Sequence, residues 1–450
     1  MSQATSIARS EFGATSPAVS VKRVGGALLL IYVWWFLIYT DVHYCAAHYI
    51  GGGPIFRRIT LVLLIPMLLI LLQRGIVGGI YWPMVLWTAL HFATIFVSVN
   101  RGLAFFGFKS TVFYLVAFTT TVAVVRTPSD ALILCRMLLL SFVWYFIQGI
   151  PNGLVRWHPE LGNPDAFGGF SAMGMGFAYY CGMAAKSKKW RYLGYGVSVL
   201  GAVGVVASFA RGAFLAAVVV AFAVWLRSPR KLRALGAAAA GAILVIASAE
   251  EIFPKGAFWA EMKTISEGTS SGTGEGRWTV WTDVAWPVFL TSPIIGVGAH
   301  NTGAVGAMII APDEVGGRFA KNPGRLYNHP LHSVYFQILA EEGAVGVLLW
   351  MWMAADFFRR LSRMRTEPAR AVWARAVGGQ VELAYMANAL EVAMVGFLIA
   401  GIFYNQAYRH WFYTLILLAL LISETTRRQM LRAAQQPEMA AGSKLSVDLP

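Results

Sequence analysis

The sequence has little charge and few cysteines. Charged residues make up 13% of its 450 residues, whereas a soluble domain usually carries about 25%, so an ordinary cytosolic enzyme is excluded. The three cysteines, Cys45, Cys135 and Cys181, cannot build a disulfide framework, and none has the spacing of a zinc site. The chain instead has 57% hydrophobic residues and 16 tryptophans, which is typical of a membrane protein with aromatic anchors at the interface.

Several motifs are also absent. No Asp-x-Asp pair occurs, so a Mg²⁺-held diphosphate lacks its usual ligands, and there is no GxxxxGK[ST] loop for ATP. Residues 268–272 match GxSxG, but they lie in a Gly/Ser-rich loop, which argues against an acyl-transfer nucleophile. We therefore expect no metal and no cofactor. If a diphosphate leaves here, arginines should take up its charge.

Apolar runs long enough to cross a bilayer, about 20 residues each, predict about twelve transmembrane helices. They lie near 25–41, 59–73, 79–98, 103–124, 131–150, 165–185, 191–209, 212–226, 232–249, 332–357, 384–403 and 408–424. The first nine fall within residues 25–249 and the last three within 332–424. Between the two groups we expect an extramembrane subdomain at 250–331, packed on the bundle because it has little core of its own.

The basic residues orient this bundle. The formal net charge is +15, and most of it falls in the loops 186–191, 227–233 and 359–375 and in the C-terminal tail. Because short cytoplasmic loops are rich in Lys and Arg, we place both tails, residues 1–24 and 425–450, in the cytoplasm. The intervening outer segment is nearly neutral, with eight acidic and six basic residues. The charge is thus mainly a topology signal, and nucleic-acid binding loses its main support.

Two arginines on the predicted outer face are candidate ligands for an anion. Arg211 interrupts the apolar sequence between two spans, and Arg277 follows the Gly/Ser-rich run. Arg211 could equally be an interfacial side chain that reaches toward the headgroups, and Arg277 a solvated loop residue. The functional interpretation is a pair of planar guanidinium groups that bind phosphate. Arg318, Lys321 and Arg325 would extend them into a basic patch.

His332 begins the tenth predicted span and follows His329 by three residues. A histidine at a helix start is usually structural. At a span mouth on the same side as the two arginines, however, His332 is a candidate general base, because an imidazole takes up a proton near neutral pH. A zinc site is the rival interpretation, but no third ligand of suitable spacing accompanies the two histidines.

Four acidic residues lie in or near the tenth and eleventh spans: Glu341, Glu342, Glu382 and Glu391. Proton-coupled transporters use such intramembrane acids, which favours a transporter. The same acids could be tied to helix ends and neighbouring amides. The sequence leaves structural pairing and transport equally open.

Four motifs occur in an order that resembles one family. They are Leu161–Asp165 (LGNPD), Ser208–Ala213 (SFARGA), Gly296–Gly298 (GVG) and His332–Gly343 (HSVYFQILAEEG). Together with about twelve spans and a long outer segment before the last three, they resemble the O-antigen ligase and polymerase superfamily. One position departs from the family pattern: Ser333 stands where asparagine is frequent.

The resemblance is closest to the O-antigen ligases. It implies an all-α, polytopic, GT-C-like glycosyltransferase of the bacterial inner membrane with its active site facing the periplasm. Such an enzyme transfers O-antigen polysaccharide from undecaprenyl diphosphate to the lipid A-core oligosaccharide by an inverting, metal-independent mechanism.

The resemblance also implies roles for individual residues. His332 would be the general base, and Arg211 and Arg277 would bind the diphosphate. Contacts with the phosphorylated acceptor would fall to Arg318, Lys321, Arg325 and His329. An O-antigen polymerase, with the same donor and a second carrier-linked acceptor, is the nearest alternative. A lipid or sugar transporter is the alternative from a different class.

Overall fold

The computed structural model describes residues 25–41, 53–74, 80–149, 163–228, 277–310 and 330–445, and the single positions 231, 232, 236, 260 and 263. Across these residues the regular elements are helices, and the sole β pairing is an isolated bridge between Ala185 and Val381. The all-α prediction is confirmed.

Eight helices precede the outer segment in the described part of the chain. They are α1 (Gly26–Thr40), α3 (Gly53–Arg74), α4 (Trp82–Val97), α5 (Arg101–Val124), α6 (Pro128–Gly149), α7 (Pro164–Ala184), α8 (Lys188–Ala207) and α9 (Arg211–Arg227). Among the described residues of the outer segment, three short elements occur: η4 (Val280–Ala285), α13 (Trp286–Thr291) and α14 (Thr302–Ile309). Four helices follow: α16 (Val334–Arg363), α17 (Glu367–Ala376), α18 (Leu383–Ala400) and α19 (His410–Leu445).

The predicted spans agree with these helices wherever the chain is described. Eleven of the twelve predicted ranges lie on a helix, and the twelfth, 232–249, lies largely outside the described residues. Five described helices are long and apolar enough to cross a membrane, namely α5, α6, α8, α16 and α18. Shorter apolar helices include α1 and α4. This pattern is that of a polytopic membrane protein, and the number of twelve spans stays a prediction.

Two helices extend beyond their predicted ends. α16 continues from the apolar run to Arg363, and α19 continues past residue 424 to Leu445. The α16 extension is rich in Arg, and the α19 extension is rich in Arg, Gln, Met and Ala, all of which are strong helix formers. The end of an apolar run therefore marks where the helix stops being apolar. It does not mark where the helix ends.

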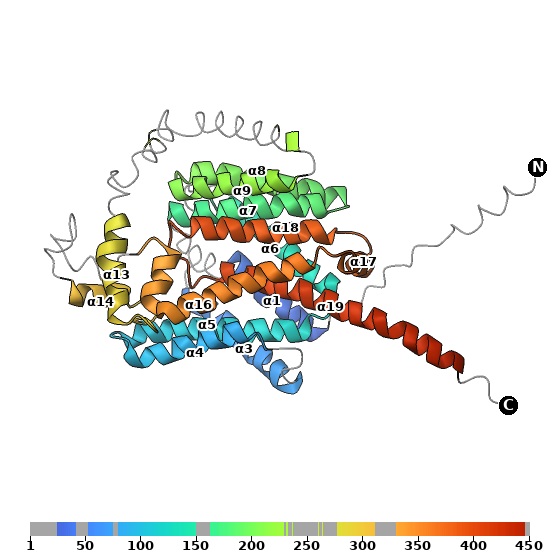
Figure 1. Ribbon diagram of the computed structural model, residues 1–450, viewed down its shortest axis with the longest axis horizontal. Helices are drawn as coiled ribbons and strands as arrows, with labels where there is room; N and C mark the ends of the chain where they lie inside the picture. The colour runs from blue at the N-terminus through green and yellow to red at the C-terminus, as the bar shows by residue number, and fades with distance from the viewer. Residues whose placement is uncertain are drawn as a thin grey trace, which may run out of the picture.

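The helices form layers around α16 (Figure 1). α7, α8, α9 and α18 pack together on one side of α16, while α4 and α5 lie on the other. Glycines allow close approach in the first group: a Cβ at Gly194 of α8 would lie 2.6 Å from the backbone nitrogen of Gly182 in α7. Small residues at helix contacts are typical of membrane bundles, since packing replaces the hydrophobic drive between helices.

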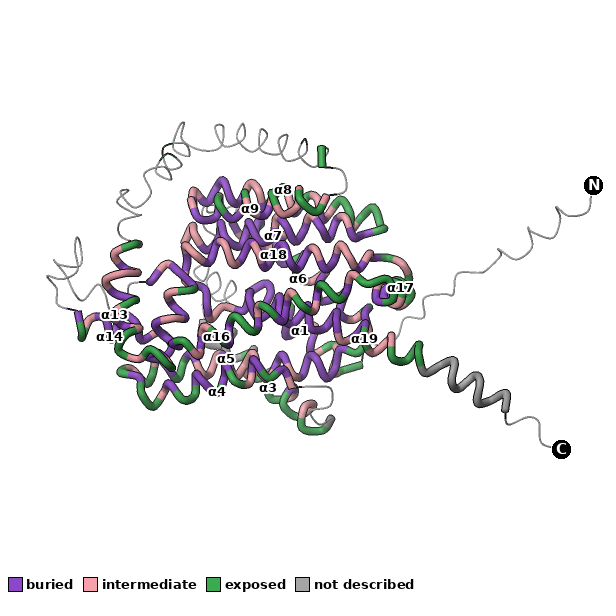
Figure 2. Tube along the Cα trace, viewed as in Figure 1, coloured by how far each residue is buried: buried purple, intermediate pink, exposed green. Residues whose placement is uncertain are grey.

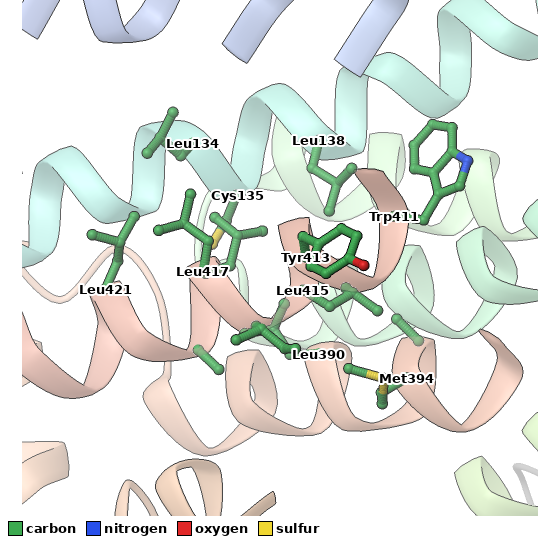
Figure 3. Close-up of a cluster of buried hydrophobic side chains, with 14 of the residues drawn as sticks. Leu134, Cys135, Leu138, Leu390, Met394, Trp411, Tyr413, Leu415, Leu417 and Leu421 are labelled. Atoms are coloured by element: carbon green, nitrogen blue, oxygen red, sulfur yellow. The ribbon is translucent and has the colours of Figure 1, made fainter. Parts of the chain in front are cut away.

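The centre of the bundle is apolar and aromatic. Buried positions gather on the helix faces that meet each other (Figure 2). Figure 3 shows one such contact, where Leu134 and Leu138 of α6 and Leu390 and Met394 of α18 surround α19 around Tyr413. These three helices, far apart in sequence, form a single core.

One end of the bundle collects charged residues in ion pairs. Asp356 of α16 bonds Arg360, and Arg360 also lies 3.5 Å from Glu424 of α19. Glu391 of α18, with 4% of its side chain exposed, receives two hydrogen bonds from Arg365, at 2.8 and 2.6 Å. The candidate site lies at the opposite end, where α5, α7, α9 and α16 begin.

Candidate active site

The first turn of α7 places a carboxylate at this end of the bundle. The side chain of Asn163 caps the helix by accepting a hydrogen bond of 2.7 Å from the backbone nitrogen of Ala166, and Pro164 occupies the first helical position. Asp165 follows, and its Oδ2 accepts a hydrogen bond of 2.8 Å from Nη2 of Arg277. Both side chains are 19% exposed, so this ion pair is only partly shielded from solvent.

His332 lies beside the same carboxylate. Its Nδ1 is 3.9 Å from Oδ2 of Asp165, which is longer than a hydrogen bond. The backbone of His332 has φ of 52°, a left-handed conformation that is uncommon outside glycine and concentrates at functional sites. The surrounding turn supports it: Ser333 caps α16, and the nitrogen of Val334 donates to the carbonyl of Gly401 at 2.8 Å.

Arg211 is the first residue of α9, after a tight turn from α8. Phe209 in this turn has φ of 53°, an outlier for a bulky residue. The turn lies against α7, because a Cβ at Gly168 would come within 2.3 Å of Oγ of Ser208. The SFARGA motif thus has a structural reason, since it packs the start of α9 against the start of α7. Arg211 thereby joins the end of the bundle that carries Asp165 and His332.

The outer segment packs onto the start of α16 and positions Arg277. Nε1 of Trp281 donates a 2.7 Å hydrogen bond to the carbonyl of Leu331, and the Trp281 ring stacks on Phe336 with centroids 5.2 Å apart. Residues 277–291 are helical, with a π-helical turn at Val280–Ala285. π-helical turns inside helices are frequent at functional sites.

The GVG motif ties the outer segment to a kink in α16. Gly296 and Gly298 have φ of 75° and 89°, and the nitrogen of Gly298 donates to the carbonyl of Glu341 at 2.8 Å. A Cβ at Gly296 would lie 2.3 Å from the carbonyl carbon of Glu341. Gly343 breaks the helix with φ of 64° and ψ of −166°. All three glycines are therefore required by backbone conformation or close approach.

This geometry agrees with what the comparisons found. Residues 196–351 match the family model described as O-antigen ligase. This part of the chain is therefore similar to the O-antigen ligase family. This confirms the family resemblance and supports an O-antigen ligase or polymerase type of function, that of membrane glycosyltransferases of lipopolysaccharide synthesis. The matched range contains Arg211, Arg277 and His332, while Asp165 precedes it. No curated protein matches the chain.

Glu341 and Glu342 of α16 belong to a buried network. Oη of Tyr408 lies 2.7 Å from Oε2 of Glu341 and 3.1 Å from Oε1 of Glu342. Thr302 of α14 donates to Glu341 at 3.1 Å, and Nε2 of His91 is 3.2 Å from Glu342. Each of these buried acids thus has polar partners from other helices, as Glu391 has in Arg365, and structural pairing requires such partners. They favour that interpretation of the acids over transport.

The predicted residues thus fall into two groups. Arg211, Arg277 and His332 lie at one end of the bundle, and two of them lie close to Asp165. The other candidates lie outside the described residues, namely Arg318, Lys321, Arg325 and His329. The part of the chain that is described contains no cluster of three or more His, Cys, Asp or Glu able to hold a metal ion.

Asp165 is the site residue to which sequence reasoning assigned no role. It was part of the LGNPD motif, and an acid in the first turn of an apolar helix after Asn-Pro was the available signal. Its partner Arg277 is 112 residues away in sequence, so their contact could not be read from spacing.

Proposed function

We propose that this protein is an O-antigen ligase that transfers O-antigen polysaccharide from undecaprenyl diphosphate to the lipid A-core oligosaccharide. The observation that carries the proposal is the cluster of Asp165, Arg277 and His332 at the end of the bundle where α7 and α16 begin. Arg277 is hydrogen-bonded to Asp165 at 2.8 Å, and Nδ1 of His332 lies 3.9 Å from the same carboxylate oxygen. The O-antigen ligase family match over residues 196–351 supports the same reaction class.

His332 is the general base in this scheme. Asp165 lies on the Nδ1 side of the ring, so a proton on Nδ1 points toward a carboxylate and Nε2 is the basic nitrogen. The 3.9 Å separation shortens to a hydrogen bond when the substrates bind, as catalytic contacts in ligand-free enzymes often do. Nε2 then takes the proton of the acceptor hydroxyl as its oxygen attacks the anomeric carbon.

The arginines and helix ends stabilise the leaving group. As the bond from the anomeric carbon to the diphosphate oxygen breaks, negative charge accumulates on the diphosphate, and preorganised cations lower the energy of that transition state. Arg211 and Arg277 supply the two positive charges. The N-termini of α7, α9 and α16 add partial positive charge at the same end. Asp165 occupies one amino group of Arg277, and a guanidinium has five N–H donors.

The attack inverts the anomeric configuration and needs no metal in this scheme. The acceptor approaches the face of the anomeric carbon opposite the diphosphate, so base and arginines act on opposite sides of one sugar. Arg318, Lys321, Arg325 and His329 remain proposed contacts for the acceptor phosphates. The active site would face the periplasm of a bacterium from the inner membrane, with both chain termini in the cytoplasm.

The test is transfer by the purified full-length protein, with a glycan on undecaprenyl diphosphate and a lipid A-core acceptor. We expect ligation that is unchanged in excess EDTA and abolished in His332→Ala, whose elution profile and circular dichroism should equal those of the wild type. Full activity of His332→Ala would overturn the assignment of the base. Loss of activity in EDTA that a divalent ion restores would overturn the metal-independent mechanism.

A further inference from the structure

A pocket lies at the same end of the bundle, away from the cluster of Asp165 and His332. It has a volume of about 470 Å³ and lies between the turn that joins α4 to α5 and one face of α14. Its lining residues are Val99, Asn100, Arg101, Ala304, Ala307 and Met308. The pocket thus combines one cation with apolar walls.

The chemistry of the lining is amphipathic. Arg101 is exposed, and none of the described residues forms an ion pair with it. Val99 and Met308 are 55% and 69% exposed, so large apolar surfaces flank the guanidinium. Phe105, one turn further along α5, is 54% exposed as well. A cation beside a continuous apolar surface is suited to a lipid with an anionic headgroup.

The two walls of the pocket are held together by hydrogen bonds. The nitrogen of Asn100 donates to Oδ1 of Asn301 at 2.8 Å, and Nδ2 of Asn301 donates to the carbonyl of Asn100 at 3.2 Å. Oγ of Ser98 donates to the carbonyl of Val297 at 2.9 Å. Asn301 is fully buried, so the contact between the α4–α5 turn and the segment before α14 is sealed from solvent. The pocket is therefore a preformed feature.

The pocket and Arg211 lie on opposite sides of α16. α16 packs against α4 on one side and α18 on the other, and α18 in turn packs against α7 and α9, where Asp165 and Arg211 lie (Figure 1). Thr302 at the start of α14 bonds Glu341 of α16. His332, at the start of α16, thus stands between the two flanks.

We infer that this pocket binds the phosphorylated lipid end of the acceptor glycolipid, with a phosphate on Arg101 and acyl chains along the exposed apolar residues. The inference rests on the proposed function. If the diphosphate donor lies on the α7 and α9 flank, an acceptor on the α4 and α5 flank brings its sugar hydroxyl to His332 from the opposite direction. That arrangement is what displacement with inversion requires.

The test measures binding rather than transfer. Full-length His332→Ala in detergent is titrated with three lipids, and binding is measured by native mass spectrometry. The lipids are phosphorylated lipid A, enzymatically dephosphorylated lipid A, and phosphatidylglycerol as a generic anionic lipid. Arg101→Gln removes the cation and Met308→Trp fills the pocket from an exposed position. The matched controls are Lys109→Gln, on the same helix, and Ile309→Trp, an exposed neighbour of Met308.

We expect Arg101→Gln and Met308→Trp to weaken binding of phosphorylated lipid A about tenfold, the equivalent of one charge-assisted hydrogen bond. The two control variants should bind it like the parent, and dephosphorylated lipid A should bind weakly to all of them. The inference would be overturned if Arg101→Gln bound phosphorylated lipid A as tightly as its parent does. It would also be overturned if phosphatidylglycerol bound as tightly as lipid A. Because no turnover is needed, failure of transfer by the wild type would refute the proposed function and leave this result standing.

Discussion

Asp165 accepts a hydrogen bond from Arg277 and lies on the Nδ1 side of His332, so one carboxylate links a proposed phosphate ligand to the proposed base. In the proposed reaction, its negative charge would stabilise the imidazolium that forms when His332 takes a proton. It also holds Arg277 in place from a different part of the chain. A single residue thus connects the two halves of the proposed reaction.

We expect Asp165→Asn to lower kcat by at least about tenfold, because an amide can hold the imidazole in the wrong tautomer and does not stabilise its charged form. The pH dependence of kcat should shift as well, since the residue acts through the ionisation of His332. Asp283→Asn, in the outer helix, is the matched control and should retain activity. An Asp165→Asn enzyme with the kcat and pH profile of the wild type would contradict this role.

A substitution at Arg211 can show whether the planar shape of the guanidinium matters in addition to its charge. Lysine keeps the positive charge but has no planar fork, so Arg211→Lys should lose most of its transfer activity, about 100-fold if the guanidinium contacts the diphosphate in the transition state. Arg191→Lys, at the charged end of the bundle, should be active. Retention of more than half of the wild-type rate in Arg211→Lys would show that a point charge suffices.

At the scale of elements, the site depends on how helices begin and on the turns between them. α7 and α16 start with side-chain caps from Asn163 and Ser333, and left-handed residues precede α9 and α16. Such residues cost free energy, and the structure around them must compensate. The motifs that resemble the family lie at these turns, which explains why they are short and separated by long apolar stretches.

The contact of Gly296 with the backbone of α16 allows the cost of such a strained position to be measured. Gly296→Ala places a methyl group against the backbone of α16 at a left-handed position, and we expect a loss of about 2 kcal/mol or more of stability. Gly196→Ala in α8 is the matched control, because a Cβ there meets nothing within 4 Å. Thermal unfolding in detergent should show a lower Tm for Gly296→Ala and an unchanged or higher Tm for Gly196→Ala.

At the scale of the whole molecule, the two ends of the bundle differ in chemistry. Ion pairs among Asp356, Arg360, Arg365 and Glu391 gather at one end, and the candidate site lies at the other. The turns that carry Arg101, Arg211 and His332 belong to the latter, in agreement with the alternation of inner and outer loops inferred from the basic residues. The two substrates would therefore reach His332 from the same side of the membrane.

The whole-cell prediction distinguishes ligase from polymerase. Deletion of the gene should leave lipid A-core without polymer while carrier-linked polymer accumulates, because polymerisation precedes ligation. A polymerase defect would instead leave single repeat units on the lipid A-core. Electrophoresis of lipopolysaccharide from the deletion strain, with the gene restored on a plasmid as the control, separates the two outcomes.

Sequence by itself determined the helical class, the positions of the apolar helices and the family resemblance, because runs of apolar residues and short motifs are local properties of the chain. It also identified Arg211, Arg277 and His332 as candidates. Tertiary structure alone decided that Asp165 joins Arg277 and His332, and that Glu341 and Glu342 are paired with Tyr408 and His91. These partners come from helices far apart in the chain, and only the packing of those helices brings them within reach.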